Sequence, residues 1–434
     1  MTKFIDFKNI LSRINRWEII LVMGFLTPIL IIFLIHPYVS STDEKLQLEA
    51  SINLITGNGY VINNVLTGQN NVYLSNWPIG YSTVIAILIK LGLPLIISAK
   101  IYKIFFLIIG FFLWYVLSTY FLDSLLYRIA FLSLLNLSTF RICFAAGTEL
   151  TLWAFFALLS LSIINFNFNS QKIKSRLFYI SIILSLFPLF KYVGIAVFII
   201  CFIWLLLSIG KQSKLFIRSF FFLFSLPIFI TCTIFINNYI NQSLWPNDGS
   251  YNVYSPVGME IISLFNVKYI IQIVLPALFK AINAMMLGNF LLFDFIKEGF
   301  QYILFIIGFP TSFPHFTFLL AVGFFSISIY YSNYMLKKDM NNNYVLWLVS
   351  SFIGMYIFLF IVSFLFTELT SFDMFIPFIE RRYYHWIYPL MLIFMLICIQ
   401  LSFERKIIVK NVLIYIIIAL AVSSNILDMI NRIT

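Results

Sequence analysis

The stretch Ser41–Tyr81 reads STDEKLQLEASINLITGNGYVINNVLTGQNNVYLSNWPIGY and is the longest polar interruption in a chain that is otherwise mostly apolar. Asp43 and Glu44 follow soon after the first apolar run, where water would meet a membrane. Carboxylates at such a boundary are typical of proton transfer or cation binding. A loop that is exposed to water also carries acidic residues without any such function. The meaning of these two acids therefore depends on the rest of the chain.

A short helix is predicted within this stretch. Leu48, Ile52 and Ile55 recur at helical spacing, which predicts an amphipathic helix at 44–55 lying on the membrane surface. The sequence GNGY at 57–60 would end it, because glycine tolerates the left-handed turn that follows a helix.

The composition is that of a membrane protein. Hydrophobic residues make up 62% of the 434 residues and charged residues only 10%, whereas charged residues are about a quarter of an ordinary soluble domain. Long apolar runs recur along the whole length, which predicts an all-α polytopic membrane protein with one domain over residues 1–434. The net charge of +11 does not indicate nucleic-acid binding, because the basic residues lie in short clusters between apolar runs.

The N-terminal segment sets the predicted orientation. Basic residues between Lys3 and Arg16 precede the first apolar run, and no small-residue cleavage site follows it. The run is therefore expected to be a retained span that starts in the cytoplasm, so that residues 37–98 form a first external loop with interfacial helices. The abundance of Ile, Phe, Lys and Asn indicates an AT-rich genome, and we expect a bacterial plasma (inner) membrane.

The apolar piece at 78–97 is predicted not to cross the membrane. If it crossed, the four basic loops near residues 172–176, 211–218, 337–338 and 405–410 would all lie outside, against the positive-inside bias. A half-helix on the outer face keeps all four loops in the cytoplasm, at the cost of placing Lys100 and Lys103 at the outer boundary.

About eleven transmembrane helices follow from this choice, and the C-terminus is expected outside. Residues 237–314 are predicted to be external, interfacial or re-entrant, and two further spans there would raise the count to thirteen. The predicted spans are 19–35, 102–122, 129–145, 150–164, 177–189, 192–209, 216–236, 316–335, 344–366, 385–401 and 412–429.

With this topology the strongly polar residues gather at the outer face. Each of these residues also has a purely structural explanation. Lys191 can extend to the membrane interface, and Glu149 can stabilise the start of a helix. Acids and bases at one face would nevertheless suit a pocket that binds an anionic phosphate and deprotonates a hydroxyl. The residues concerned are Asp43, Glu44, Glu149, Lys191, Asp248, Glu380, Arg381 and Arg382.

The sequence contains only weak indications of metal binding or of thiol chemistry. The four cysteines lie inside apolar runs without a CxxC pair, and the three histidines form no ligand pair. No metal site is predicted, and a divalent cation is left open.

Five stretches resemble glycosyltransferases of the GT-C fold that use polyprenyl-phosphate sugars, in the branch related to protein O-mannosyltransferases and lipid A aminoarabinose transferases. Two of the prolines usual in the half-helix motif are replaced here by Ile79 and Ser82, residues 240–370 match poorly, and the large soluble domain of some relatives is absent. The stretches are DE at 43–44 with SINLITGNGY at 51–60, NWPIGYSTVIAIL at 76–88, GTELTLWAFFALL at 147–159, FKYVGIAVF at 190–198 and ERRYYHWIYPLMLI at 380–393.

The resemblance implies a GT-C-like fold and an inverting transfer to a hydroxyl of a glycan, lipid or protein. Asp43 would be the general base, with Glu44 as its neighbour and rival, and Glu149 would orient the acceptor or bind a divalent cation. Lys191, Arg381 and Arg382 would hold the phosphate of the donor. The substrate pocket is expected to contain Tyr60, Trp77, Tyr81 and Tyr383.

Two other functions stay open from the sequence. One is a transporter or flippase of an isoprenoid-linked or anionic substrate, and the other is a polysaccharide polymerase. A transporter of this size commonly shows inverted halves and broken helices at the membrane centre, whereas the charges here gather toward one face.

Overall fold

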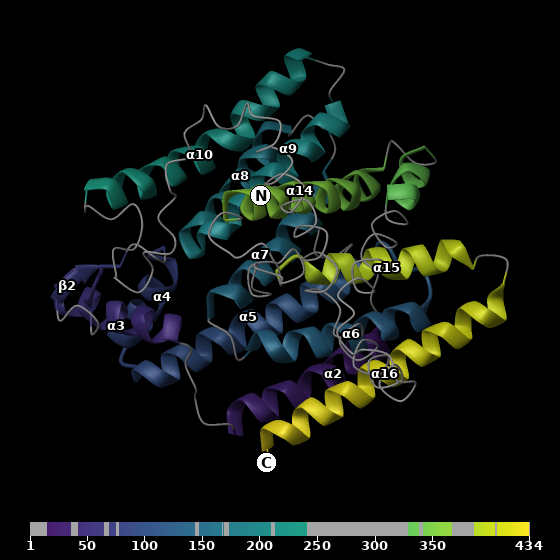
Figure 1. Ribbon diagram of the computed structural model, residues 1–434, viewed down its shortest axis with the longest axis horizontal. Helices are drawn as coiled ribbons and strands as arrows, with labels where there is room; N and C mark the ends of the chain where they lie inside the picture. The colour runs from purple at the N-terminus through teal and green to yellow at the C-terminus, as the bar shows by residue number, and fades with distance from the viewer. Residues whose placement is uncertain are drawn as a thin grey trace, which may run out of the picture.

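The computed structural model is a bundle of long helices with a small extra layer at one end (Figure 1). It describes residues 15–35, 42–64, 69–74, 78–143, 147–166, 168, 173–209, 213–240, 329–337, 342–366, 386–403 and 406–433. Its elements are α2 (Arg16–Ile35), α3 (Thr42–Thr56), β1 (Val61–Asn64), β2 (Gln69–Tyr73), α4 (Gly80–Lys90), α5 (Leu95–Ser118), α6 (Leu125–Cys143), α7 (Gly147–Ile164), α8 (Ile173–Phe190), the 3₁₀ turn η1 (Tyr192–Ile195), α9 (Ala196–Ile209), α10 (Ser213–Ile240), α14 (Asn343–Phe366), α15 (Tyr388–Ser402) and α16 (Ile407–Ile433).

Six helices are long and apolar enough to cross a membrane: α2, α5, α7, α8, α10 and α16. Their length and composition support the prediction of a helical membrane protein. Shorter apolar helices, among them α9 and α15, pack between or beside them. Of the eleven predicted spans, most of 316–335 lies outside the described residues, and so does the predicted external, interfacial or re-entrant region 237–314 beyond the end of α10.

Aromatic side chains fill the centre of the bundle. Trp114 on α5 lies with its ring centroid 6.3 Å from that of Trp153 on α7, and Phe156 packs against Trp347 and Trp386. Burying rings of this size is the largest apolar contribution that single side chains can make to packing. The α5–α7 contact brings the starts of these two helices to the same end of the bundle.

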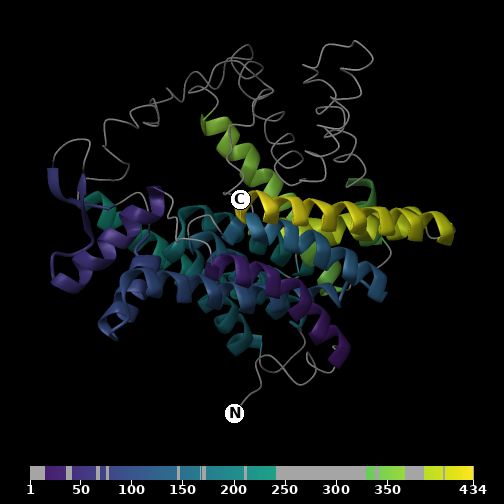
Figure 2. The same cartoon turned by 90° about the horizontal axis from the view of Figure 1, so that it is seen from below.

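The layer at the end of the bundle consists of α3, a hairpin and α4. Both views place α3 and the hairpin at the same end, away from the body of the bundle (Figure 1, Figure 2). Strands β1 and β2 pair antiparallel, with Val61 opposite Tyr73. A small second core of Ala50, Tyr60, Ile62 and Leu74 joins α3 to the hairpin.

Helix α3 confirms the helix predicted at 44–55, and it ends before Gly57, whose φ of +85° is the left-handed conformation expected there. Leu48 is buried, whereas Ile52 and Ile55 are exposed, as residues that face a membrane surface would be. The side of α3 that packs on the bundle is polar, with Glu44, Gln47 and Ser51, and it meets donors on α4 and α5.

Helix α4 has the length that the predicted half-helix requires. Its 11 residues extend about 16 Å, roughly half the thickness of a hydrocarbon core. Gly92, with a φ of +95°, and Pro94 then separate it from α5.

Helix α5 begins at Leu95, seven positions before the predicted start at residue 102. Lys100 and Lys103 therefore both lie within the helix. Lys103 is only 2% exposed. A buried ammonium is costly, so Lys103 requires a carboxylate partner.

Candidate functional site

Glu44 is the centre of a buried polar contact between three helices. Its Oε2 lies 2.8 Å from Nζ of Lys103 on α5, and its Oε1 accepts a 2.7 Å hydrogen bond from the hydroxyl of Tyr81 on α4. Both members of the ion pair are buried. In such surroundings the pair persists because both oxygens and the ammonium have partners.

A second buried ion pair lies at the start of α7. Glu149 in the first turn of α7 pairs with Lys191, which directly follows α8. Its other oxygen accepts a 3.0 Å hydrogen bond from the hydroxyl of Thr148. Each charge also lies at the helix end that favours it, since the N-terminus of a helix favours an anion and the C-terminus a cation.

Tyr81 connects the two ion pairs. Besides its hydrogen bond to Glu44, its ring packs edge-on against Tyr102 at 5.0 Å and lies against Gly147, two residues before Glu149. A Cβ placed on Gly147 would be 2.5 Å from Cε2 of Tyr81. The hydroxyls of Tyr102 and Thr151 are hydrogen-bonded to each other, so that polar contacts run from α3 through α4 and α5 to α7.

Helix α4 is docked on the end of α8. A Cβ on Gly80 would lie 2.5 Å from the carbonyl oxygen of Leu189, so only glycine allows this approach. Leu189 is two residues before Lys191. The contact therefore holds the start of α4, and with it Tyr81, at the end of α8 that precedes Lys191.

Three tyrosines and two asparagines lie between the hairpin, η1 and the end of α10. The hydroxyl of Tyr60 donates to the carbonyl of Pro78 at 3.2 Å, and the amide of Asn238 donates to the hydroxyl of Tyr192 at 2.9 Å. Asn237 likewise donates to Tyr73, whose ring meets that of Tyr60. Burial raises the pKa of Tyr60 above its ordinary value, which keeps the phenol neutral.

Five of the ten predicted site residues lie together at this end of the bundle, in a group that we call the Glu44 cluster. They are Glu44, Tyr60, Tyr81, Glu149 and Lys191. Asp43 lies in α3, but its side chain is outside the described part of the chain. Trp77, Arg381, Arg382 and Tyr383 are also outside the described residues. Lys191 was predicted to bind phosphate, and here its ammonium is paired with Glu149.

Sequence reasoning missed Lys103, Tyr102 and Gln47. For Lys103 a usable signal existed, because a lysine within an apolar helix needs a carboxylate partner, and Glu44 is among the few acids of the chain. Tyr102 and Gln47 carry no such signal, since their importance depends on which helices meet them.

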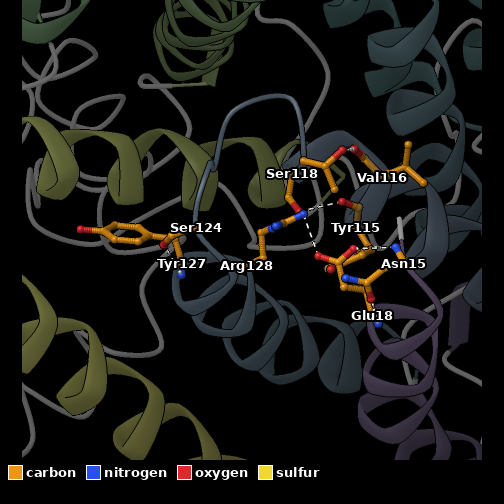
Figure 3. Close-up of polar contacts among 9 residues, drawn as sticks. Asn15, Glu18, Tyr115, Val116, Ser118, Ser124, Tyr127 and Arg128 are labelled. Carbon is orange, nitrogen blue, oxygen red and sulfur yellow. Dashed lines mark hydrogen bonds and ion pairs between the residues drawn. The ribbon is translucent and has the colours of Figure 1, made fainter. Parts of the chain in front are cut away.

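A third ion pair lies at the opposite end of α5 (Figure 3). Nη1 of Arg128 on α6 is 2.8 Å from Oε1 of Glu18 on α2. Glu18 and Asn15 also cap the start of α2 reciprocally, with hydrogen bonds of 2.9 and 3.0 Å. This pair ties α2 to α6 at the end of α5 farther from Lys103, so we regard it as structural.

Within the described residues, no group of three His, Cys, Asp or Glu side chains could hold a metal ion. The two carboxylates of the cluster each face an ammonium. Comparison of the chain with protein-family models, with curated proteins and with solved structures found no match.

Proposed function

We propose that the chain is an inverting membrane glycosyltransferase, which moves a sugar from a polyprenyl-phosphate donor to a hydroxyl acceptor at the outer face of a bacterial plasma membrane. The observation that carries the proposal is the position of Tyr81, which is hydrogen-bonded to Glu44 of the Glu44–Lys103 ion pair and lies against Gly147, two residues before Glu149 of the Glu149–Lys191 ion pair. It is supported by the motif resemblance, because four of the five quoted stretches, at 43–60, 76–88, 147–159 and 190–198, contribute to one cluster. A GT-C-like fold with about eleven spans belongs to the same proposal.

In this proposal Asp43 is the general base. Both oxygens of its rival Glu44 already accept hydrogen bonds, from Tyr81 and Lys103. Glu44 would have to give up one of these partners to receive a proton from an acceptor hydroxyl. Its role is better described as fixing the start of α3 against α4 and α5, so that the preceding residue is held at the site.

Arg381 and Arg382 are the proposed ligands of the donor phosphate. The leaving group is a lipid phosphate, which needs charge stabilisation more than protonation, and a guanidinium can bind two of its oxygens at once. Lys191 can contribute only by sharing its ammonium between Glu149 and the phosphate. Glu149 would then orient Lys191 and, through it, the donor.

The direct test is transfer by the purified protein. The protein in lipid nanodiscs is incubated with polyprenyl-phosphate sugars labelled in the sugar, together with candidate acceptors, and released polyprenyl phosphate and labelled product are measured. We expect release with at least one donor, and none with a variant lacking the carboxylate of Asp43. Repeated glycosyl addition to one growing chain would instead favour a polysaccharide polymerase.

A carrier gives a different result. In sealed proteoliposomes a transporter or flippase would move the intact lipid-linked sugar across the bilayer and would leave the bond between sugar and phosphate unbroken. Such movement without bond cleavage would refute the proposed enzyme.

A further inference from the structure

Helices α8 and α10 both begin at the end of the bundle opposite the Glu44 cluster. The last turn of α8 lies against Gly80 of α4, and Asn237 near the end of α10 donates to the hydroxyl of Tyr73 on the hairpin. Both helices therefore end at the layer of α3, α4 and the hairpin, and their first turns lie at the far end of the bundle. In the predicted topology that end faces the cytoplasm.

Three cations converge on the surface between the first turns of these helices. The two helices pack against each other, and Nζ of Lys174 on α8 lies 6.0 Å from the centroid of the Phe222 ring on α10. Lys214, Arg218 and Phe222 follow one another at intervals of four residues, so they form one stripe along α10. Lys174 thus reaches across to the stripe that carries the other two cations. We call Lys174, Lys214 and Arg218 the α8–α10 basic group.

No ion pair neutralises the α8–α10 basic group in the part of the chain that the structure describes. All three side chains are exposed, and none of them takes part in the ion pairs between described residues. The sequence contains no aspartate or glutamate between Glu149 and Asp248, a stretch that includes both helices and their connections. Like charges one turn apart, such as Lys214 and Arg218, are unfavourable on a helix. A bound anion would remove this repulsion.

Exposed aromatic side chains follow the cations on both helices. Phe178 lies one turn after Lys174 on α8 and is 53% exposed, and Phe221 lies three residues after Arg218 on α10 and is 64% exposed. Both helices therefore present positive charge first and aromatic side chains next, in the direction from the end of the bundle toward its middle. An anionic phospholipid has the same order, with a phosphate at the membrane surface and acyl chains below it. A free phosphate would match the cations alone.

We propose that the α8–α10 basic group binds the phosphate of an anionic phospholipid, whose acyl chains lie along Phe178 and Phe221. Basic surfaces between helices on the cytoplasmic side suit anionic headgroups of this kind. The positive-inside bias would also place cations at this end of the bundle, but it does not require Lys174 to turn toward the neighbouring helix. The inference does not rest on the proposed function, because the lipid lies at the end of the bundle away from the Glu44 cluster.

The test compares an anionic with a zwitterionic lipid. Purified protein in a neutral detergent is titrated with phosphatidylglycerol and with phosphatidylcholine of the same acyl chains, and bound lipid is counted by native mass spectrometry. The wild type should bind phosphatidylglycerol more tightly. The double variant Lys214→Gln/Arg218→Gln should weaken that binding about 30-fold, because each cation near the membrane surface contributes roughly a factor of five toward an anionic lipid. Its binding of phosphatidylcholine should not change.

A second double variant, Lys406→Gln/Lys410→Gln, is the matched control. It removes two positive charges from another basic segment on the same predicted side, where Nζ of Lys410 lies 5.8 Å from the centroid of the Tyr127 ring. It should bind phosphatidylglycerol as the wild type does. Equal losses in the two double variants would show that the lipid responds only to net charge, and would overturn the inference.

Single variants keep the test independent of the stability of the double variant. Lys214 and Arg218 are exposed, so their double variant should unfold without lipid at the wild-type temperature. If it does not fold, Lys174→Gln and Arg218→Gln test the same group one charge at a time, each with an expected loss of about fivefold. Arg218→Lys keeps the charge and should retain binding. Unchanged phosphatidylglycerol binding in both single glutamine variants would overturn the inference.

Competition experiments identify the source of the phosphate. Inorganic phosphate at the same concentration should not displace bound phosphatidylglycerol. Displacement would show that the acyl chains contribute nothing, and would contradict a lipid site. Polyprenyl phosphate is the other candidate lipid. If it binds more tightly than phosphatidylglycerol and loses this binding in Lys214→Gln/Arg218→Gln, the group belongs to an isoprenoid phosphate and the inference is wrong. Equal binding of phosphatidylglycerol and phosphatidylcholine by the wild type would also overturn it.

Discussion

Nζ of Lys103 lies 2.8 Å from Oε2 of Glu44, although the two residues are 59 positions apart in the sequence and belong to helices that differ in character. Glu44 comes from a polar helix and Lys103 from an apolar one. Neither charge would be stable in its buried position alone. The pair therefore acts as the contact that holds the layer of α3 and α4 on the bundle.

Removing one member of this pair should destabilise the protein strongly. Glu44→Gln or Lys103→Met leaves a buried group without its partner, and we expect a loss of about 3–5 kcal/mol in the free energy of unfolding. The double variant removes both charges and should recover a large part of that loss. Thermal unfolding in detergent measures all three variants.

Lys45→Met is the matched control for the lysine substitution, because Lys45 is exposed on α3 next to Glu44. Its effect should stay within about 0.5 kcal/mol. Additive losses in the double variant, equal to the sum of the two single losses, would contradict a direct coupling between Glu44 and Lys103.

Gly147→Ala should disturb the cluster through Tyr81. A Cβ at this position would lie 2.5 Å from the Tyr81 ring, so the ring has to move and its hydrogen bond to Glu44 is strained. We expect lower stability and at least a 10-fold loss of sugar transfer, since misplacing a site by about 1 Å can cost as much as 10²-fold in rate.

Gly24→Ala provides the comparison for this glycine, because nothing lies within 4 Å of a Cβ built there. It should be neutral or slightly stabilising, as alanine favours a helix more than glycine does. A Gly147→Ala variant with wild-type stability and transfer would show that the contact between Tyr81 and Gly147 does not matter for the site.

The helix positions were largely predictable from the sequence. Predicted and observed ends agree within a few residues for α2, α7 and α14, because a long apolar run has sharp limits where polar residues begin. Helix α5 begins seven residues before the predicted span, and Lys103 lies inside both. A single sequence does not show that a distant carboxylate removes the cost of burying an ammonium.

The site was predictable only in part, for a related reason. Glu44 and Glu149 could be placed at one end of the bundle from topology alone, and both lie in the cluster. Which face of α3 packs on the bundle could not be predicted, since the period of 3.6 placed Leu48, Ile52 and Ile55 against the membrane surface and assigned no partner to the other side of the helix. The packed side is polar because Tyr81, Ser82 and Lys103 supply hydrogen bonds to it, and these partners come from elements far along the chain.

The half-helix assignment of α4 predicts the side of the membrane for two basic loops. Because an 11-residue helix is too short to cross, reporter enzymes fused after Lys172 and after Lys214 should both be cytoplasmic. A fusion within α3, on the opposite side, should report an external location. External signals from both loop fusions would reverse the topology and would remove the outer-face site with it.

Arg382→Lys should weaken donor binding although the positive charge is kept. Arg381 and Arg382 are adjacent guanidinium groups at the predicted external mouth of a late span, and lysine lacks the planar fork that binds two phosphate oxygens. We expect about a 10-fold or larger rise in the Kd for the polyprenyl-phosphate sugar, measured in nanodiscs. Unchanged Kd values in both Arg382→Lys and Arg382→Ala would indicate that this residue only anchors the helix at the membrane surface.

Asp43→Asn should abolish most of the transfer while folding and donor binding persist. The amide is nearly isosteric with the carboxylate but cannot accept a proton at neutral pH, so the expected loss in turnover is about 10²–10⁴-fold. Glu44→Gln is a different kind of change, since it breaks the contact with Lys103 and should first appear as lost stability. Activity of its folded fraction is therefore the proper comparison, and it should exceed that of Asp43→Asn. Full activity of Asp43→Asn, with a folded but inactive Glu44→Gln, would assign the base to Glu44. Full activity of both would exclude this loop from proton transfer and would favour a carrier, because a carrier breaks no glycosidic bond.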